Sequence, residues 1–233
     1  AIADQHFFIR PGSDVLMLLA MLHVVFSEKL QTLGSVAAFV RGVERIEKLV
    51  ADYPPEKVAH ITGLDPEQLK TLVRDFCRAD SASCYGRFGV STQEYGTLTQ
   101  WLIVVLNIVS GNLDVPGGAM FSKPAIDILA RPAKKAKSKK PEKGYADYFS
   151  RVRKLPNFGN EFPVATLAEE ITTSGEGQIR ALITSAGNPV LSTPNGNQFD
   201  EALTKLEYMV SIDFYVNETT RHANIILPPL SAL

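Results

Sequence analysis

Cysteine and histidine, the residues that most often bind metals in proteins, are scarce in this sequence of 233 residues. The only two cysteines, Cys77 and Cys84, can neither build a disulfide scaffold nor supply the four thiolates of an iron–sulfur cluster. We interpret them as buried or incidental thiols. The four histidines stand apart, with no HExxH pattern and no spacing from cysteine that suits zinc. The sequence therefore predicts no metal-binding and no catalytic residue among these types.

Long apolar runs and net charge are lacking as well. The longest apolar stretch, residues 15–26, falls short of the roughly 20 residues that span a bilayer and contains His23. We therefore expect a buried helix there and no transmembrane segment. The formal net charge of −1 gives no general reason to expect nucleic acid or an anionic membrane as a partner. No GxGxxG, Walker or nucleophile-elbow motif is present.

Both ends of the chain resemble cut points within a longer protein. The chain begins with Ala1, shows no leader with a basic and then an apolar part, and stops at Leu233 directly after a strand-like apolar run. Because a domain seldom ends with its last strand barely closed, we expect the parent protein to continue beyond both ends.

Helical periodicity dominates the first half. Phe7–Ile9 reads as a short strand, and Ser13 and Asp14 after Arg10-Pro11-Gly12 predict a capped helix to about Glu28. The further predicted helices cover about 36–50, a stretch after the start signal Asp65-Pro66-Glu67-Gln68, and a stretch through 101–106 that Gly111 ends.

The second half alternates strands and helices. Residues 180–184, 208–212 and 224–227 read as strands, the first of them buried, with a helix near 165–172 before the first strand and one near 199–206 between the first two. This order with short connections predicts a parallel α/β sheet. Polar loops, 185–189 and 213–220, follow the first two strands at the edge where such sheets bind ligands.

Two acidic residues have two readings each. Asp213 at a strand tip can accept hydrogen bonds from ribose or from the N1–H and amino group of guanine, or it can serve only as a cap or turn. Asp14 can bind a ligand or only complement the helix dipole. The residues by themselves leave both alternatives open.

The fold class predicted is α/β, with parallel-sheet, Rossmann-like layers flanked by helices. We expect a helix-rich α/β part at 1–125, a basic insert and linker at 126–160, and a second, truncated α/β part at 161–233. Residues 131–143 of the insert hold seven Lys or Arg and one Glu, without an aromatic residue to stack on bases. Such a run is typical of a solvated loop, with a partner-docking patch as the alternative.

Four segments in order resemble the molybdopterin oxidoreductases, the family of dimethyl sulfoxide reductase, periplasmic nitrate reductase and formate dehydrogenase. Each is similar to one motif of that family, and together they cover nearly the whole chain outside the basic insert. They are Ile9-Arg10-Pro11-Gly12-Ser13-Asp14, Ile61-Thr62-Gly63-Leu64, the stretch from Gly86 to Gly118 with Leu106-Asn107 and Ser110-Gly111-Asn112, and Asp213 to Pro228 with Asn217-Glu218-Thr219-Thr220.

The resemblance implies two cofactor-binding parts, each holding one guanine dinucleotide of a bis-molybdopterin guanine dinucleotide with molybdenum or tungsten. The resemblance implies no metal ligand within this sequence, and it implies a 4Fe-4S cluster in the region before Ala1. The positions that match the family's cofactor-binding residues are Gly12, Ser13, Asp14, Phe88, Thr92, Asn188, Ile212 and Asp213.

The resemblance also implies what the parent does. It would be an oxidoreductase that carries out two-electron or oxo-transfer chemistry on a small-molecule substrate with an electron-transfer partner, and this segment alone would be inactive. One alternative is an electron-transfer scaffold like the large iron–sulfur subunit of respiratory complex I, without molybdopterin. A second alternative is a plain nucleotide-binding or interaction module that docks through its basic insert.

Overall fold

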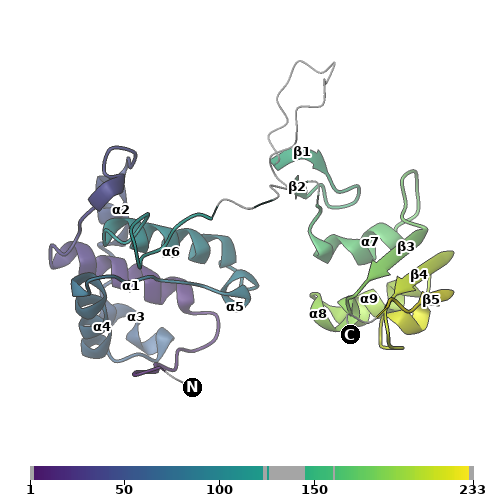
Figure 1. Cartoon of the computed structure of the whole chain (residues 1–233), viewed down its shortest axis with the longest axis horizontal. Coiled ribbons are helices and arrows are strands. Elements are labelled where there is room, and N and C mark those ends of the chain that lie inside the picture. The colour runs from purple at the N-terminus through teal and green to yellow at the C-terminus, as the bar shows by residue number, and fades with distance from the viewer. Residues whose placement is uncertain (1–2, 123–124, 126–144, 160, 231–233) are drawn as a thin grey trace, which may run out of the picture. The chain divides into compact units, whose positions relative to one another are not determined.

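The computed structural model describes residues 3–122, 125, 145–159 and 161–230. The chain forms two compact units, Ala1–Lys123 and Pro124–Leu233, here called the first and the second unit (Figure 1). The predicted basic loop at 131–143 lies outside the described residues.

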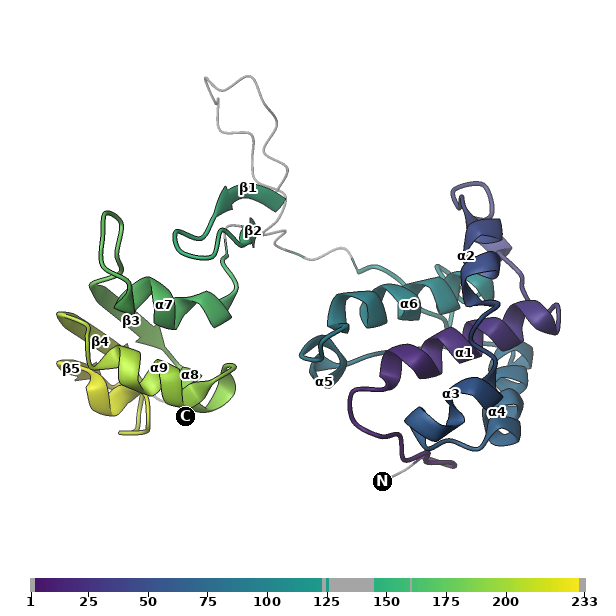
Figure 2. The same ribbon diagram turned by 180° about the vertical axis from the view of Figure 1, so that it is seen from behind.

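The first unit is built around one buried helix, α1 (Asp14–Ser27), as its apolar run predicts. In Figure 2, α6 lies along one side of α1, and α3 and α4 lie along the other. Leu22, Val25 and Leu106 are fully buried at the centre of the core between these helices. The other elements are η1 (Gly34–Val36), α2 (Val43–Val50), α3 (Pro55–Thr62), α4 (Pro66–Arg78), α5 (Phe88–Ser91) and α6 (Gly96–Val109).

The described part of the first unit differs from the prediction in three local features. Phe7–Ile9 is not a strand, because no neighbouring segment pairs with it there. The helix predicted at about 36–50 begins only at Val43, because Gly42 has a left-handed φ of 83° that a helix cannot continue through. Ser13 occupies the N-cap position of α1, but its hydroxyl donates to the Arg10 carbonyl at 2.6 Å and caps no backbone N–H.

The start signal of α4 forms as predicted, since Asp65 Oδ1 accepts a hydrogen bond from the Gln68 backbone N–H at 2.9 Å. We expect Asp65→Ala to destabilise the first unit by about 1 kcal/mol, because one N–H of the first helical turn loses its acceptor. Urea unfolding measures this loss. Asp65→Asn, which keeps the accepting oxygen, should restore most of the stability, and equal losses in both variants would contradict the capping role.

The second unit contains a three-stranded parallel sheet in the order β3–β4–β5, which confirms the parallel α/β prediction. Its strands are β3 (Ala181–Ser185), β4 (Tyr208–Ile212) and β5 (Ile225–Leu227). An antiparallel pair that the sequence did not predict, β1 (Tyr145–Phe149) and β2 (Pro156–Phe158), precedes the sheet. The helical elements are η2 (Val164–Thr166), α7 (Leu167–Thr172), α8 (Pro189–Ser192), α9 (Gly196–Leu203) and η3 (Thr220–His222).

The helices of the second unit pack on one face of this sheet. Ile171 of α7, Phe199 of α9 and Met209 of β4 share one buried cluster. The prediction that the first strand is buried is wrong, because the side chain of Ile183 is 71% exposed on the opposite face. Across the described residues of both units, no helix combines the length and apolar character needed to cross a membrane.

Candidate functional site

The turn before α1 is fastened to the end of α3. The Arg10 backbone N–H donates to the Thr62 carbonyl at 2.9 Å, and Arg10 Nη1 donates to the His60 carbonyl at 2.7 Å. Gly63 ends α3 here with a φ of +78°, a left-handed conformation that favours glycine. Two of the four sequence segments that carry the resemblance therefore form one local structure.

A side-chain hydrogen bond joins the start of α1 to the loop around α5. Gln93 Nε2 donates to Asp14 Oδ2 at 2.6 Å, so the Asp14 carboxylate has a partner besides the helix dipole. In that loop Phe88 is 75% exposed, and Thr92 is exposed with its hydroxyl donating to the Gly89 carbonyl at 3.2 Å. The predicted cofactor-binding residues of the first unit are thus gathered at one end of α1.

Two buried asparagines that sequence reasoning left without a role hold the segment around Ala82 and Cys84 that leads into this loop. Asn107 of α6 accepts from the Cys84 N–H at 2.9 Å and donates to the Cys84 carbonyl at 2.8 Å. Asn112 Oδ1 accepts from the Ala82 N–H at 3.1 Å. A polar amide within an apolar helix was the signal that could have revealed this arrangement, since buried polar groups are hydrogen-bonded.

The predicted cofactor-binding residues of the second unit line one cavity of about 320 Å³ at the carboxyl ends of β3 and β4. This volume lies at the lower end of the range for ligand pockets, about 300–1,000 Å³. We call it the strand-tip cavity. Its lining includes Ala186, Gly187 and Asn188 after β3, and Ile212, Asp213, Phe214 and Tyr215 from β4 onward.

One carboxylate oxygen of Asp213 stabilises the turn that follows β4. Asp213 Oδ1 accepts from the Phe214 N–H at 2.7 Å and from the Tyr215 N–H at 3.3 Å. Asp213 Oδ2 has a longer contact, 3.5 Å, with the Asn217 amide. The turn interpretation of Asp213 is therefore right for Oδ1, while Oδ2 has only this weak partner in a residue that lines the cavity.

Asn188 is oriented by a network of buried and charged groups. The Thr219 hydroxyl, fully buried, donates to Asn188 Oδ1 at 2.7 Å and accepts from the Val190 N–H at 3.0 Å. Asn188 Nδ2 donates to the Glu218 carboxylate at 2.7 Å. This hydrogen bond from Asn188 is the main cause that lowers the pKa of Glu218. The hydrogen bonds of Asn188 with Thr219 and Glu218 therefore join the loop after β3 to the loop after β4.

Comparison with known proteins decides the family. The model of the family described as molybdopterin oxidoreductase matches the whole chain, residues 1–233. The chain belongs to the molybdopterin oxidoreductase family. Formate dehydrogenase H of Escherichia coli is 28% identical over 242 residues, which cover 99% of this chain and 33% of that protein. Nitrate reductase of Symbiobacterium thermophilum is 28% identical over 252 residues, covering 97% of this chain and 32% of that protein.

A solved structure also has this fold. Acetylene hydratase from Pelobacter acetylenicus matches 97% of this chain and 34% of that chain with a TM-score of 0.77 at 19% identity. Across these comparisons the chain spans about a third of the length of its molybdopterin oxidoreductase relatives.

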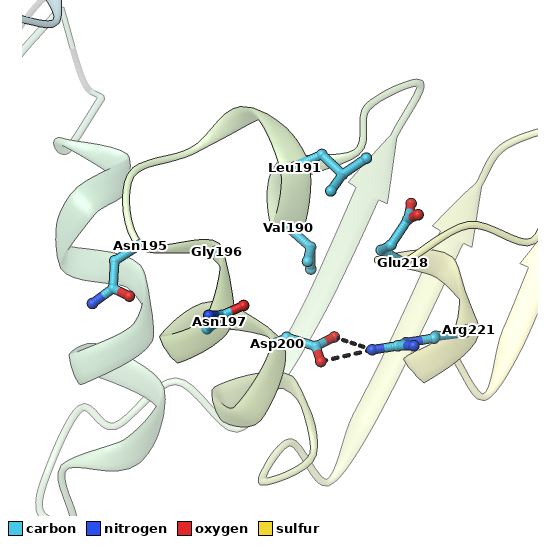
Figure 3. Close-up of a pocket in the computed structure, with 8 residues that line it drawn as sticks. All are labelled: Val190, Leu191, Asn195, Gly196, Asn197, Asp200, Glu218 and Arg221. Atoms are coloured by element: carbon cyan, nitrogen blue, oxygen red, sulfur yellow. Dashed lines mark hydrogen bonds and ion pairs between the residues drawn. The ribbon is translucent and has the colours of Figure 1, made fainter.

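A second cavity of this molybdopterin oxidoreductase segment lies beside α8 and α9, and Figure 3 shows its lining. Its volume is about 340 Å³. Asp200 lines this cavity, and its two carboxylate oxygens accept hydrogen bonds from Arg221 Nη2 at 2.7 and 2.6 Å. Asp200 Oδ1 also lies 2.7 Å from His222 Nε2. The hydrogen bonds from His222 and then Arg221 lower the pKa of Asp200. This ion-pair cluster, which sequence reasoning missed, fastens α9 to η3.

The cysteines of the molybdopterin oxidoreductase segment lie at the edge of the first core. Burial raises the pKa of Cys77 and raises that of Cys84 to about 11, so both thiols stay protonated at neutral pH. No group of three or more His, Cys, Asp or Glu side chains that could hold a metal occurs in the described ranges.

Proposed function

We propose that this chain holds the two guanine dinucleotide arms of a bis-molybdopterin guanine dinucleotide in a molybdenum or tungsten oxidoreductase. The second unit would bind one arm through Asn188, Ile212 and Asp213, and the first unit would bind the other through the turn at 12–14 and the loop with Phe88 and Thr92. The observation that carries the proposal is the strand-tip cavity with the Asp213 carboxylate at its edge.

The donors and acceptors of this cavity fit a guanine nucleotide. Guanine presents an N1–H and an amino group side by side, and Asp213 Oδ2, which has only a weak partner, could accept from them. The flat rings of Phe214 and Tyr215, 56% and 74% exposed, offer surfaces on which a base can stack. At Gly187 only the Ser185 carbonyl, at 3.8 Å, lies within 4 Å of an added Cβ, so the backbone there is open to close approach.

The first unit offers a similar set of groups. Gly12 has a φ of +82° and no atom within 4 Å of an added Cβ, which leaves the turn backbone open toward a ligand. Asp14, held by Gln93, supplies a carboxylate next to this turn. A fixed acid beside accessible backbone suits the polar edge of a nucleoside, as it does in the second unit.

The part of this chain in the reaction would be binding and orientation. When bound, the metal of the cofactor supplies the two-electron or oxo-transfer chemistry. The two guanine sites would fix the cofactor at its outer ends, so that its reactive centre is placed without a ligand from this segment. The groups that contact the substrate and the electron-transfer partner would belong to other parts of the parent.

Metal and nucleotide analysis of the purified full-length parent tests the proposal. We expect molybdenum or tungsten by mass spectrometry and about two GMP per metal after acid hydrolysis, because each cofactor carries two guanine dinucleotides. Iron without molybdenum, tungsten or GMP would contradict the proposal and would identify an electron-transfer scaffold of the complex I type.

A further inference from the structure

The side-chain amide of Asn188 is held between two partners from the loop after β4. Asn188 Oδ1 accepts from the Thr219 hydroxyl at 2.7 Å, and Asn188 Nδ2 donates to Glu218 Oε2 at 2.7 Å. Asn188 itself lines the strand-tip cavity. An amide has a donor end and an acceptor end of nearly the same shape, so its partners decide on which side of the residue each end lies.

The Thr219 hydroxyl fits either orientation of this amide. It carries one hydrogen and two lone pairs, and one lone pair accepts from the Val190 N–H at 3.0 Å. The hydroxyl can therefore donate to Asn188 Oδ1, as it does here, or accept from Nδ2 of a turned amide. Thr219 thus holds the amide in place without choosing between its two ends.

The Glu218 carboxylate fits only one orientation. An ionised carboxylate accepts hydrogen bonds and has none to donate, so only the Nδ2 end of Asn188 can face it. The hydrogen bond from Asn188 is the first of the causes that lower the pKa of Glu218, so this carboxyl is ionised at neutral pH. A turned Asn188 would place its oxygen against the carboxylate, acceptor against acceptor.

Glu218 does not line the strand-tip cavity. Its side chain lines the cavity beside α8 and α9 instead, as Figure 3 shows. A hydrogen-bonded path from Glu218 to a ligand in the strand-tip cavity therefore runs through Asn188. Glu218 can set the hydrogen-bonding pattern of that cavity without touching its ligand.

We propose that Glu218 is a positioning residue that fixes the Asn188 amide so that its second N–H selects a base with an acceptor. One hydrogen of Asn188 Nδ2 is bonded to Glu218, and the other remains for a ligand. Guanine has the acceptor O6 where adenine has an amino group. This inference rests on the proposed function, in which Asp213 accepts from the neighbouring N1–H of guanine.

The preference for GMP over AMP in the full-length parent, freed of cofactor, tests this inference. Each nucleotide is titrated while hydrogen exchange of peptides from the strand-tip loops, 185–189 and 213–220, reports its dissociation constant at this cavity. Both nucleotides carry the same phosphate, so the ratio of their dissociation constants cancels the effect of a changed charge on the phosphate. We expect Glu218→Lys to lower the preference about tenfold or more, because lysine only donates and draws Asn188 Oδ1 toward itself.

Two further variants separate positioning from a general loss of structure. Glu218→Gln keeps an oxygen that accepts from Asn188 Nδ2, so most of the preference should remain. In an Asn188→Ala background, Glu218→Lys should change the preference by less than about twofold, because the amide that it turns is missing. Glu201→Lys, on the exposed surface of α9, is the matched control for the charge and should leave the preference unchanged.

Glu218 is exposed, so we expect Glu218→Lys to fold, and Glu218→Arg, which also only donates, gives a second reading. An unchanged preference in Glu218→Lys would overturn the positioning role, as would an equal loss with and without Asn188. Either result would leave GMP binding and the proposed function standing. If the wild-type protein bound no GMP at this cavity, the proposed function and this inference would both be contradicted.

Discussion

Asp213→Ala in the full-length parent is expected to weaken binding of the cofactor by about 10- to 100-fold and to lower its occupancy accordingly. Under the proposed function, Asp213→Ala removes charge-assisted hydrogen bonds from guanine, each contributing about 1.5–3 kcal/mol. GMP and metal content per protein measure the loss. Only the cavity of the second unit is changed, so the contacts proposed between the first unit and the other guanine should persist.

Asp213→Asn separates this role from the turn. The asparagine oxygen can still accept from the Phe214 N–H, so the turn that Asp213 Oδ1 makes should persist. Its amino group would face the amino group and N1–H of guanine, donor against donor. We therefore expect Asp213→Asn to lose cofactor as Asp213→Ala does, but with little loss of stability. Wild-type cofactor occupancy in Asp213→Asn would contradict the guanine assignment, and Asp213 would then be only a turn residue.

Thr219→Val should destabilise the second unit by about 2–4 kcal/mol. The valine has nearly the shape of threonine, but the Val190 N–H loses its acceptor and Asn188 Oδ1 loses its donor. The buried Val190 N–H left without a partner costs about 1–3 kcal/mol, and the lost hydrogen bond to the half-buried Asn188 adds about 1 kcal/mol. The midpoint of urea unfolding measures the total, and faster hydrogen exchange of the Val190 amide would locate the effect.

Thr172→Val is the matched control for this substitution. Thr172 is exposed at the end of α7, and its hydroxyl donates to the Ala168 carbonyl at 3.0 Å. Because water can replace that contact, we expect a change within about 0.5 kcal/mol. If Thr219→Val were no more destabilising than Thr172→Val, the Thr219 hydroxyl would not hold the two strand-tip loops together.

Local signals in the sequence determined most elements of the fold. The apolar run of α1 and the cap of α4 predicted helices that the structure contains. The alternation of strands and helices after residue 160 predicted the parallel sheet. These features depend on neighbours within a few residues, so pattern and propensity suffice to reveal them. Two failures, Phe7–Ile9 as a strand and β3 as a buried one, concern contacts with other segments. Two others, the late start of α2 after Gly42 and the missing side-chain cap of α1 at Ser13, are local.

The candidate site was only partly visible in the sequence. The strand-tip position of Asp213 and the turn at 12–14 could be found from motif and topology. Asn107, Gln93 and Thr219 could not be given roles, because their partners lie 23, 79 and 31 residues away in the chain. A hydrogen bond between distant residues leaves no periodic signal.

The sequence by itself thus determined the α/β class, the elements and the chemical types at the strand tips. Only the tertiary structure decided which of those side chains meet. It showed that Asp213 gives one oxygen to its own turn, that Thr219 orients Asn188, and that one face of the sheet has no cover among the described residues. The physical reason is that helix and turn formation are local, whereas burial and side-chain pairing depend on how distant segments pack.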